Sequence, residues 1–246
     1  MDKINYIFLA LALIAEIIGT VGGFGSSVFF VPLGNFYFDF HSVLGLTAIF
    51  HLSSNVSKIV LFKKGIDKGL ILKIGLPAVI FVIVGGLLSK VLNTYLLEII
   101  LALFLVGLSL LFLVKKDLIV IPNSKNAVTG GALSGFSAGL LGTGGAIRGL
   151  TMAAFNLEKS VFIATSAFID FMIDFSRTFV YYQNGYIHKH DFIYIPFLLI
   201  IGIAGTYIGK KILTHISQDK FKRISLILIL CIGIATLVKV ILNLKN

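Results

Sequence analysis

Three basic side chains lie inside apolar stretches of this sequence, apart from the other lysines and arginines: Lys58, Arg148 and Arg177. A charge at the middle of a bilayer costs about 2.5–3.5 kcal/mol on insertion scales, so it is expected to have a partner or a task. Asp170 and Asp174 lie in the same stretch as Arg177, and the spacing of the three puts them on one face of a helix. Such a face can carry a proton, help to bind an anion, or form a structural ion pair.

A second polar stripe, His51, Asn55 and Lys58, lies 119 residues earlier at the same internal spacing. Histidine titrates near neutral pH, and burial can shift a carboxyl group into the same range. We therefore expect proton coupling to use these groups, although Lys58 and Arg177 are near enough to helix ends to extend towards the membrane surface instead. The candidate coupling residues are His51, Lys58, Asp170, Asp174 and Arg177.

Glycine-dense segments interrupt two apolar runs, at Gly19–Ser27 and Gly135–Gly145. They predict breaks followed by half-helices over 28–38 and 146–156, whose free N–H groups and positive dipole ends suit an anion. The alternative is close helix packing, which small residues allow. The candidate substrate-binding residues are Gly23, Gly25, Ser26, Ser27, Asn55, Gly142, Thr143, Gly144, Gly145 and Arg148.

Arg148 is expected in the first turn of the second half-helix. A guanidinium beside a helix N-terminus is repelled unless an anion or a carboxylate lies between them. Arg148 therefore indicates an anionic substrate, or else a permanent bridge to Asp170 or Asp174. Glu16, buried by its position in the first apolar run, is a further candidate for lining a pathway.

The composition indicates a membrane protein. Of 246 residues 57% are apolar and 13% charged, and mean hydropathy is +1.01, whereas a soluble domain carries about a quarter charged residues. The net charge of +10 comes from bases between apolar runs, which suits anionic lipid headgroups and not a nucleic acid. One cysteine excludes an internal disulfide. His188 and His190 beside Asp191 are interpreted as a headgroup contact, so no metal and no cofactor are expected.

Eight apolar runs predict an all-α integral membrane protein of about eight transmembrane helices. The 119-residue offset divides the single membrane domain, 1–246, into two four-helix repeats with glycine-broken first helices. Repeat 1 is 1–116, the linker 117–126, and repeat 2 127–246. Four crossings per half give parallel repeats, unless the glycine-rich segments only dip in and return. Counting bases over eight crossings favours both ends in the cytoplasm. The runs lie at about 4–22, 41–62, 70–90, 95–114, 127–155, 159–182, 191–214 and 221–243.

Four motifs carry a resemblance to a known family. Two of them lie in the first half of the chain, Gly23–Pro32 followed by Val43–Thr47. The other two lie in the second half, Gly142–Ala146 followed by Ala164–Ser166. Together they resemble the paired signatures of the TauE/SafE sulfite exporter-like permeases. The resemblance covers nearly the whole chain, including the four-plus-four plan. It implies permeation or export of small anions such as sulfite or sulfonates, with the glycine-rich segments near the pathway.

The chain departs from this family pattern at several positions. Arg148 stands where an apolar residue is usual, Thr151 replaces the proline matched by Pro32, and the sixth run carries Asp170 and Asp174. These departures concern the substrate more than the fold.

The expected function is therefore secondary transport of a small, sulfur-containing anion by alternating access in the plasma or inner membrane, with proton coupling as a further hypothesis. The expected partners are a small anionic solute, membrane lipids and protons, and the oligomeric state stays open. A passive anion or proton channel is one alternative. An intramembrane hydrolase built on Ser26 and His51 is another, since a nucleophile and a base are the minimum for such chemistry.

Overall fold

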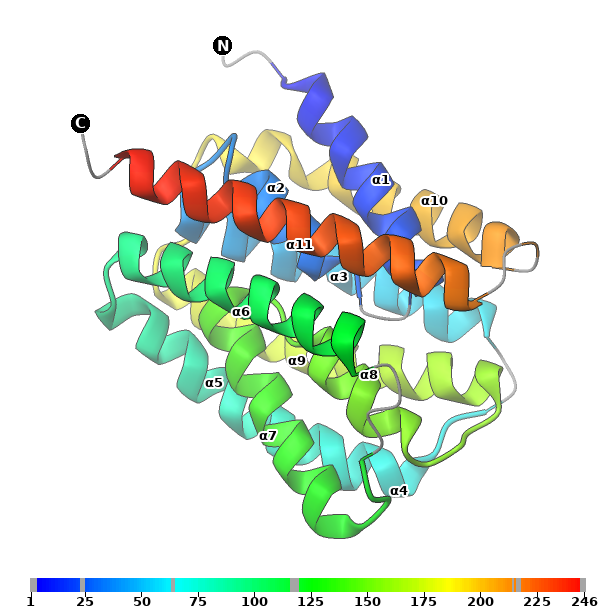
Figure 1. Cartoon of the computed structure of the whole chain (residues 1–246). Helices are drawn as coiled ribbons and strands as arrows, with labels where there is room; N and C mark the ends of the chain where they lie inside the picture. Colours follow the sequence, from blue (N-terminus) through cyan, green and yellow to red (C-terminus); the bar gives the residue numbers. More distant parts are fainter. Residues whose placement is uncertain are drawn as a thin grey trace.

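The computed structural model describes residues 4–22, 25–62, 65–115, 120–213, 215 and 218–243, with only the backbone given for 218–222 and 243. This part of the chain is helical and contains no strand (Figure 1). Its elements are α1 (Tyr6–Gly22), α2 (Ser27–Gly34), α3 (Phe40–Leu61), α4 (Lys68–Leu70), the π-helix η1 (Ile71–Gly75), α5 (Leu76–Val91), α6 (Thr94–Val114), α7 (Ser124–Leu141), α8 (Gly145–Ala153), α9 (Lys159–Gln183), the 3-10 turn η2 (Asp191–Ile193), α10 (Ile195–Leu213) and α11 (Gln218–Asn243).

Short polar side chains set where three of the long helices begin. Asp39, Asn93 and Asn123 each accept a hydrogen bond from the backbone N–H three residues further on, at 3.0, 2.7 and 2.8 Å. These residue types are the preferred N-caps, because they satisfy a donor that has no partner within the helix. As a result α7 begins at Ser124, inside the predicted linker 117–126.

The first apolar run does not continue in one direction. The ring of Phe8, near the start of α1, contacts Phe30 of α2 and Phe38 beyond it, at centroid distances of 5.6 and 4.8 Å. Near the other end of α1, the backbone of Ser26 lies against Gly19, where even a methyl group would collide with it. Helix α2 therefore runs back along α1 and returns towards the end from which α1 started.

The fifth apolar run is divided in the same way. Gly142 takes a left-handed backbone, φ 76°, directly after α7, a conformation that glycine adopts without steric cost. Ser134 in α7 then donates to the carbonyl of Gly144 at 2.9 Å. Gly130, near the start of α7, faces Thr151 near the end of α8. Helix α8 therefore returns along α7, and the expected breaks occur in both runs.

The long helices pack in pairs whose members come from different halves of the chain: α3 with α9, α6 with α11, α1 with α10, and α5 with α7. The contact of α5 with α7 is made through glycine. Gly131, Gly135 and Gly139 of α7 lie against backbone atoms of the η1–α5 segment, since small residues let membrane helices approach closely. These pairs bring helices of the first half of the chain against helices of the second throughout the bundle.

The two ends of the bundle differ in composition. One end, called here the histidine end, contains the starts of α1, α3 and α10, joined by hydrogen bonds such as Asn5 N–H to Tyr194 Oη at 3.1 Å. The opposite end, called here the basic end, contains the ends of α3 and α10, where Lys210 donates to the carbonyl of Leu61 at 2.9 Å. The start of α1 and the end of α11 both lie towards the histidine end (Figure 1).

Within the described part of the chain, five helical segments are long and apolar enough to cross a membrane, and α1 is a shorter apolar helix. Helix α9 has 25 residues, enough to span about 37 Å, but it carries Asp170, Asp174 and Arg177. The expected class of helical membrane protein is confirmed. The predicted count of eight crossings and the repeat arrangement stay predictions. The five segments are Phe40–Leu61, Lys68–Val91, Thr94–Val114, Asp191–Leu213 and Arg223–Leu242.

The glycine contact of α7 predicts opposite effects for two alanine substitutions. In Gly135→Ala the new methyl group collides with the Ala78 carbonyl oxygen, whereas a methyl group at Gly107 on the outer face of α6 meets nothing within 4 Å. Gly135→Ala should lower the free energy of unfolding by about 1–3 kcal/mol, and Gly107→Ala should leave it unchanged or raise it by up to about 1 kcal/mol. Thermal unfolding in detergent, followed by circular dichroism, measures both. Equal melting temperatures for the two variants would contradict the packing described.

Candidate functional site

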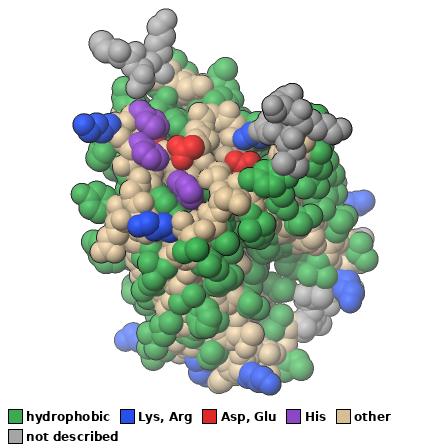
Figure 2. Space-filling view, turned by 90° about the vertical axis from the view of Figure 1, so that its left-hand side faces the viewer, with side chains coloured by type: hydrophobic (Ala, Val, Ile, Leu, Met, Phe, Trp, Pro, Cys, Tyr) green, Lys and Arg blue, Asp and Glu red, His purple; other side chains and the backbone are tan. Residues whose placement is uncertain are grey.

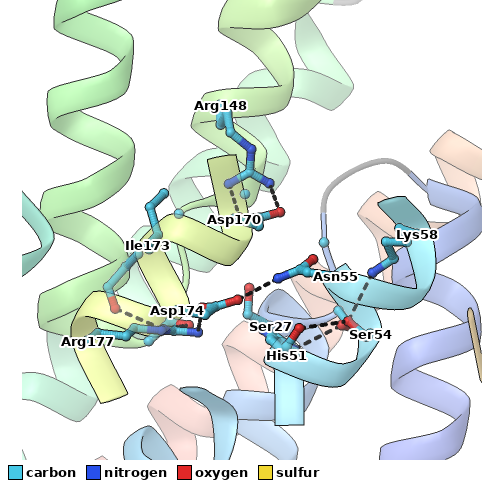
Figure 3. A pocket seen from close by; sticks show the side chains of 16 residues that line it. Ser27, His51, Ser54, Asn55, Lys58, Arg148, Asp170, Ile173, Asp174 and Arg177 are labelled. Atoms are coloured by element: carbon cyan, nitrogen blue, oxygen red, sulfur yellow. Dashed lines mark hydrogen bonds and ion pairs between the residues drawn. The ribbon is translucent and has the colours of Figure 1, made fainter. Parts of the chain in front are cut away.

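A small polar cavity lies where the starts of α2 and α8 meet the middle of α3 and α9 (Figure 3). The volume in which the centre of a water molecule fits is about 20 Å³. One water molecule needs about 10–15 Å³ of such volume. This space has room for one or two water molecules and is too small for an oxyanion of four heavy atoms. Its lining consists of Gly25, Ser26, Ser27, His51, Ser54, Asn55, Lys58, Ala138, Gly142, Gly144, Gly145, Arg148, Asp170, Ile173, Asp174 and Arg177.

The two half-helices present their N-termini to this cavity. Gly25 precedes α2 with φ 79°, and a methyl group at this position would lie 3.8 Å from the Cα atom of Gly145, the first residue of α8. Ser27 at the start of α2 donates to the hydroxyl of Thr143 at 3.2 Å. The first N–H groups of a helix have no partner within it and carry the positive end of its dipole. Two such ends converge here, which favours negative charge in the cavity.

Arg148 forms a bidentate ion pair with Asp170, in which two guanidinium nitrogens contact the two carboxylate oxygens. Its Nε donates to Ser166 at 3.1 Å. Only 2% of the Arg148 side chain is exposed, against 24% for Asp170. The carboxylate expected beside the helix N-terminus is therefore present, and it occupies the face of the guanidinium that an anion would need.

Arg177 ties α9 to the end of α7. It pairs with Asp174 at 2.7 Å and donates to the carbonyls of Ala138 and Gly142 at 3.1 and 2.8 Å. The last carbonyls of a helix lack partners within it, and its C-terminus attracts a cation. From the other side, Asn55 of α3 donates to Asp174 at 2.7 Å, so this carboxylate joins α3 to α9.

Lys58 pairs with Glu16 of α1 at 2.9 Å. The Glu16 side chain is fully buried and also accepts hydrogen bonds from Thr20 at 3.1 Å and Thr206 at 3.0 Å. Lys58 therefore does not reach the membrane surface but neutralises a buried acid. Each of the three bases in the apolar stretches has an acidic partner, so the positive and negative charges around the cavity balance.

Ser26 and His51 are close, with 3.0 Å between the hydroxyl oxygen and Nε2. The Ser26 hydroxyl, however, donates its single proton to Glu16. The hydroxyl can then only accept from His51, whereas a nucleophilic serine must donate to its histidine base. This hydrogen bonding does not favour the hydrolase alternative.

The structure brings most of the sequence-predicted site residues to one cavity. Thr143 lies just outside the lining, bound to Ser27, and Gly23 lies outside the described residues. The sequence analysis did not identify Ser54, Ser166 and Tyr181, whose hydroxyls contact Lys58, Arg148 and the carbonyls near the end of α7. No signal in the sequence separates these hydroxyls from others in the same helices. Glu16 was identifiable as the one acid in its apolar run.

The pairing around Arg177 predicts a large loss of stability on its removal. Arg177→Ala leaves Asp174 buried without its base and removes two bonds to the end of α7, so the free energy of unfolding should fall by about 3–5 kcal/mol. As a control, Arg223→Ala at an exposed position should change it by less than about 0.5 kcal/mol. Thermal unfolding in detergent and size-exclusion chromatography measure both. A melting temperature of Arg177→Ala within a degree of the parent would show that the pair is not structural.

Comparison with protein families gives a match over nearly the whole chain. Residues 8–236 match the family described as Sulfite exporter TauE/SafE. No curated protein and no solved structure matches the chain. The matched residues include both half-helices and every helix that lines the cavity. The chain therefore belongs to the TauE/SafE sulfite exporter family of membrane transporters.

Proposed function

We propose that this protein is a secondary transporter of a small sulfur-containing oxyanion, such as sulfite or a sulfonate, that binds at the cavity between α3 and α9. The observation that carries the proposal is the convergence of two half-helix N-termini on a buried arginine, Arg148, within a chain of a sulfite exporter family. Such an arrangement recognises negative charge through backbone N–H groups and a guanidinium fork. The backbone groups recognise charge and shape, so several related oxyanions fit this chemistry.

Anion binding requires Arg148 to be released from Asp170. A proton on Asp170 neutralises the carboxylate and leaves the guanidinium free to bind an oxyanion through two hydrogen bonds. Asp170 is the most exposed of the three paired acids, at 24% against 4% for Asp174 and 0% for Glu16, so it is the easiest of them for a proton to reach. The proton and the anion then occupy the site together, which keeps the charge of the buried cluster unchanged. Their combined gradients set the direction of transport.

The return of α2 along α1 and of α8 along α7 supports an inverted repeat. In this arrangement each half consists of one re-entrant hairpin and three crossings: α3, the α4–α5 segment and α6, then α9, α10 and α11. The first hairpin enters from the histidine end and the second from the basic end. The hydrogen bond between Asn55 and Asp174, which are counterparts at the 119-residue offset, supports a two-fold axis at the cavity. Rocking about such an axis is a common route to alternating access.

The distribution of bases supports a cytoplasmic basic end. Positive charge concentrates on the cytoplasmic side of membrane proteins. With re-entrant hairpins both chain termini then lie outside, opposite to the orientation expected from eight crossings. Among the described residues, Lys68, Lys73, Lys115, Lys125, Lys159, Lys210, Lys211 and Arg223 lie towards the basic end, whereas Lys90, Lys189 and Lys239 lie towards the histidine end.

Transport in proteoliposomes tests the assignment of the site. The purified protein should take up radiolabelled sulfite, faster when the outside is more acidic. Arg148→Ala should reduce uptake about tenfold to a hundredfold, since charge-assisted hydrogen bonds contribute about 1.5–3 kcal/mol each. Asp170→Asn, which leaves Arg148 without its competing carboxylate, should remove the dependence on pH.

Glu98→Gln, near the histidine end of α6 and away from the cavity, is the matched control and should transport at the parent rate. Uptake by Arg148→Ala equal to that of the parent would remove Arg148 from the site. Uptake of no tested anion above that of empty vesicles would overturn the proposed function. Saturating, exchange-type kinetics would distinguish a carrier from a channel.

Cysteine labelling tests the orientation. In a Cys231→Ala background, Lys189→Cys and Lys125→Cys place single thiols at exposed positions of the histidine end and the basic end. A membrane-impermeant maleimide added to intact cells should label Lys189→Cys and leave Lys125→Cys unlabelled until the membrane is opened. The reverse pattern would place both termini in the cytoplasm.

A further inference from the structure

Three exposed side chains with metal-binding chemistry meet at the histidine end. Asp39 precedes α3, while His188 and His190 lie in the connection between α9 and α10. One ligand atom from each of the three lies within 4.8 Å of the other two. Figure 2 shows histidine side chains gathered beside acidic ones on this face of the molecule. Because Asp39 is distant in sequence, the sequence alone shows only two histidines beside an aspartate.

A fourth group, Asp191, lies beneath these three. Its side chain is fully buried, and its Oδ2 accepts hydrogen bonds from the Ser42 hydroxyl at 2.9 Å and from the backbone N–H of His188 at 2.7 Å. Its Oδ1 accepts no hydrogen bond from the described residues, although His190 Nε2 lies 3.2 Å away. A buried carboxylate oxygen without a donor costs free energy, and this one faces the histidine pair.

We propose that Asp39, His188, His190 and Asp191 bind one divalent transition-metal ion of the Zn²⁺ class. Two imidazole nitrogens with carboxylate oxygens suit Zn²⁺ and its neighbours Co²⁺, Ni²⁺ and Cu²⁺ better than Mg²⁺ or Ca²⁺, which prefer oxygen alone. Zinc ligands lie about 2.0–2.2 Å from the metal, so the side chains must draw together. The Asp39, His188 and His190 side chains are 50%, 43% and 46% exposed and have room to do so.

Ser42 prepares one of the histidines for this role. Its hydroxyl donates to Asp191 and lies 2.6 Å from His188 Nδ1, so its oxygen accepts a hydrogen bond from the N–H at that ring nitrogen. Nε2 of His188 is then unprotonated and available to a metal, and a hydrogen bond on the second nitrogen is the usual support of a metal-bound histidine.

An ion bound at this position should affect transport, an inference that rests on the proposed function. Asp39 belongs to the segment that joins the first hairpin to α3, and the two histidines belong to the segment that joins α9 to α10. A bound ion holds these segments of the two halves together at the histidine end. It should therefore oppose any conformation that opens the cavity towards that end.

Isothermal titration of tag-free protein in detergent with ZnCl₂ tests the site. The parent should bind about one Zn²⁺ per chain, and His188→Ala with His190→Ala should weaken binding tenfold or more. Asp39→Asn keeps the helix cap, because asparagine caps as well as aspartate, and should also weaken binding. Replacing Zn²⁺ by Co²⁺ should give visible absorption bands, because Co²⁺ in a site of this kind is coloured.

His215→Ala, at the basic end, is the matched control and should bind Zn²⁺ as the parent does. Thermal unfolding without metal confirms that the variants are folded. No binding by the parent up to millimolar Zn²⁺, or equal binding by the double histidine variant, would overturn the proposal. External Zn²⁺ should slow sulfite uptake by the parent and not by the double variant. Binding without an effect on uptake would keep the site and remove its role in opening, whatever the transported anion is.

Discussion

The structure depends on one electrostatic constraint, which is that each base in the apolar interior is neutralised by an acid of the same interior. Lys58 with Glu16, Arg148 with Asp170 and Arg177 with Asp174 are the three pairs. Removing one partner of a buried pair costs about 3–5 kcal/mol, so the pairs fix which helices meet. Glu16 links α1 to α3 through Lys58, Asp170 holds α8 beside α9, and Arg177 joins α9 to the end of α7.

The same constraint explains why the cavity is small here. Asp170 occupies the two guanidinium nitrogens of Arg148 that could bind an oxyanion. The space between the two half-helix N-termini has room for one or two water molecules. In the mechanism that we propose, a proton on Asp170 provides the compensating change that an anion needs in order to bind at this site. Anion selectivity and proton dependence would then have a common origin in a single ion pair.

Much of this could be predicted from the sequence, and the limits have physical reasons. The apolar runs predicted the bounds of the long helices closely, because hydropathy and N-caps are local properties. For example, the predicted run 41–62 corresponds to the observed helix Phe40–Leu61. The breaks after Gly22 and Leu141 were predicted from glycine density. Hydropathy does not show in which direction a helix runs, however, so it could not show that α2 and α8 turn back. Counting each apolar run as one crossing therefore gave a membrane orientation opposite to the one now proposed.

The site was predictable in its members and less so in its pairings. The stripes His51–Asn55–Lys58 and Asp170–Asp174–Arg177 identified the two helices that face each other, since a helical period fixes which residues share a face. The partner of Lys58 depends on where α1 lies in the bundle, and that of His51 on the return of α2. Such contacts come from tertiary structure, as does the approach of Asp39 to His188.

The hydrogen bond between Asn55 and Asp174 joins residues that are counterparts but not identical. At the 119-residue offset the two stripes match His51 with Asp170, Asn55 with Asp174, and Lys58 with Arg177, so one half carries acids where the other carries neutral or weakly basic groups. Two conformations related by exchanging the halves would therefore differ in energy, because the ions they bury are not the same. The resting protein should favour one facing direction even without a gradient, and a change as small as Asn55→Asp would shift that preference.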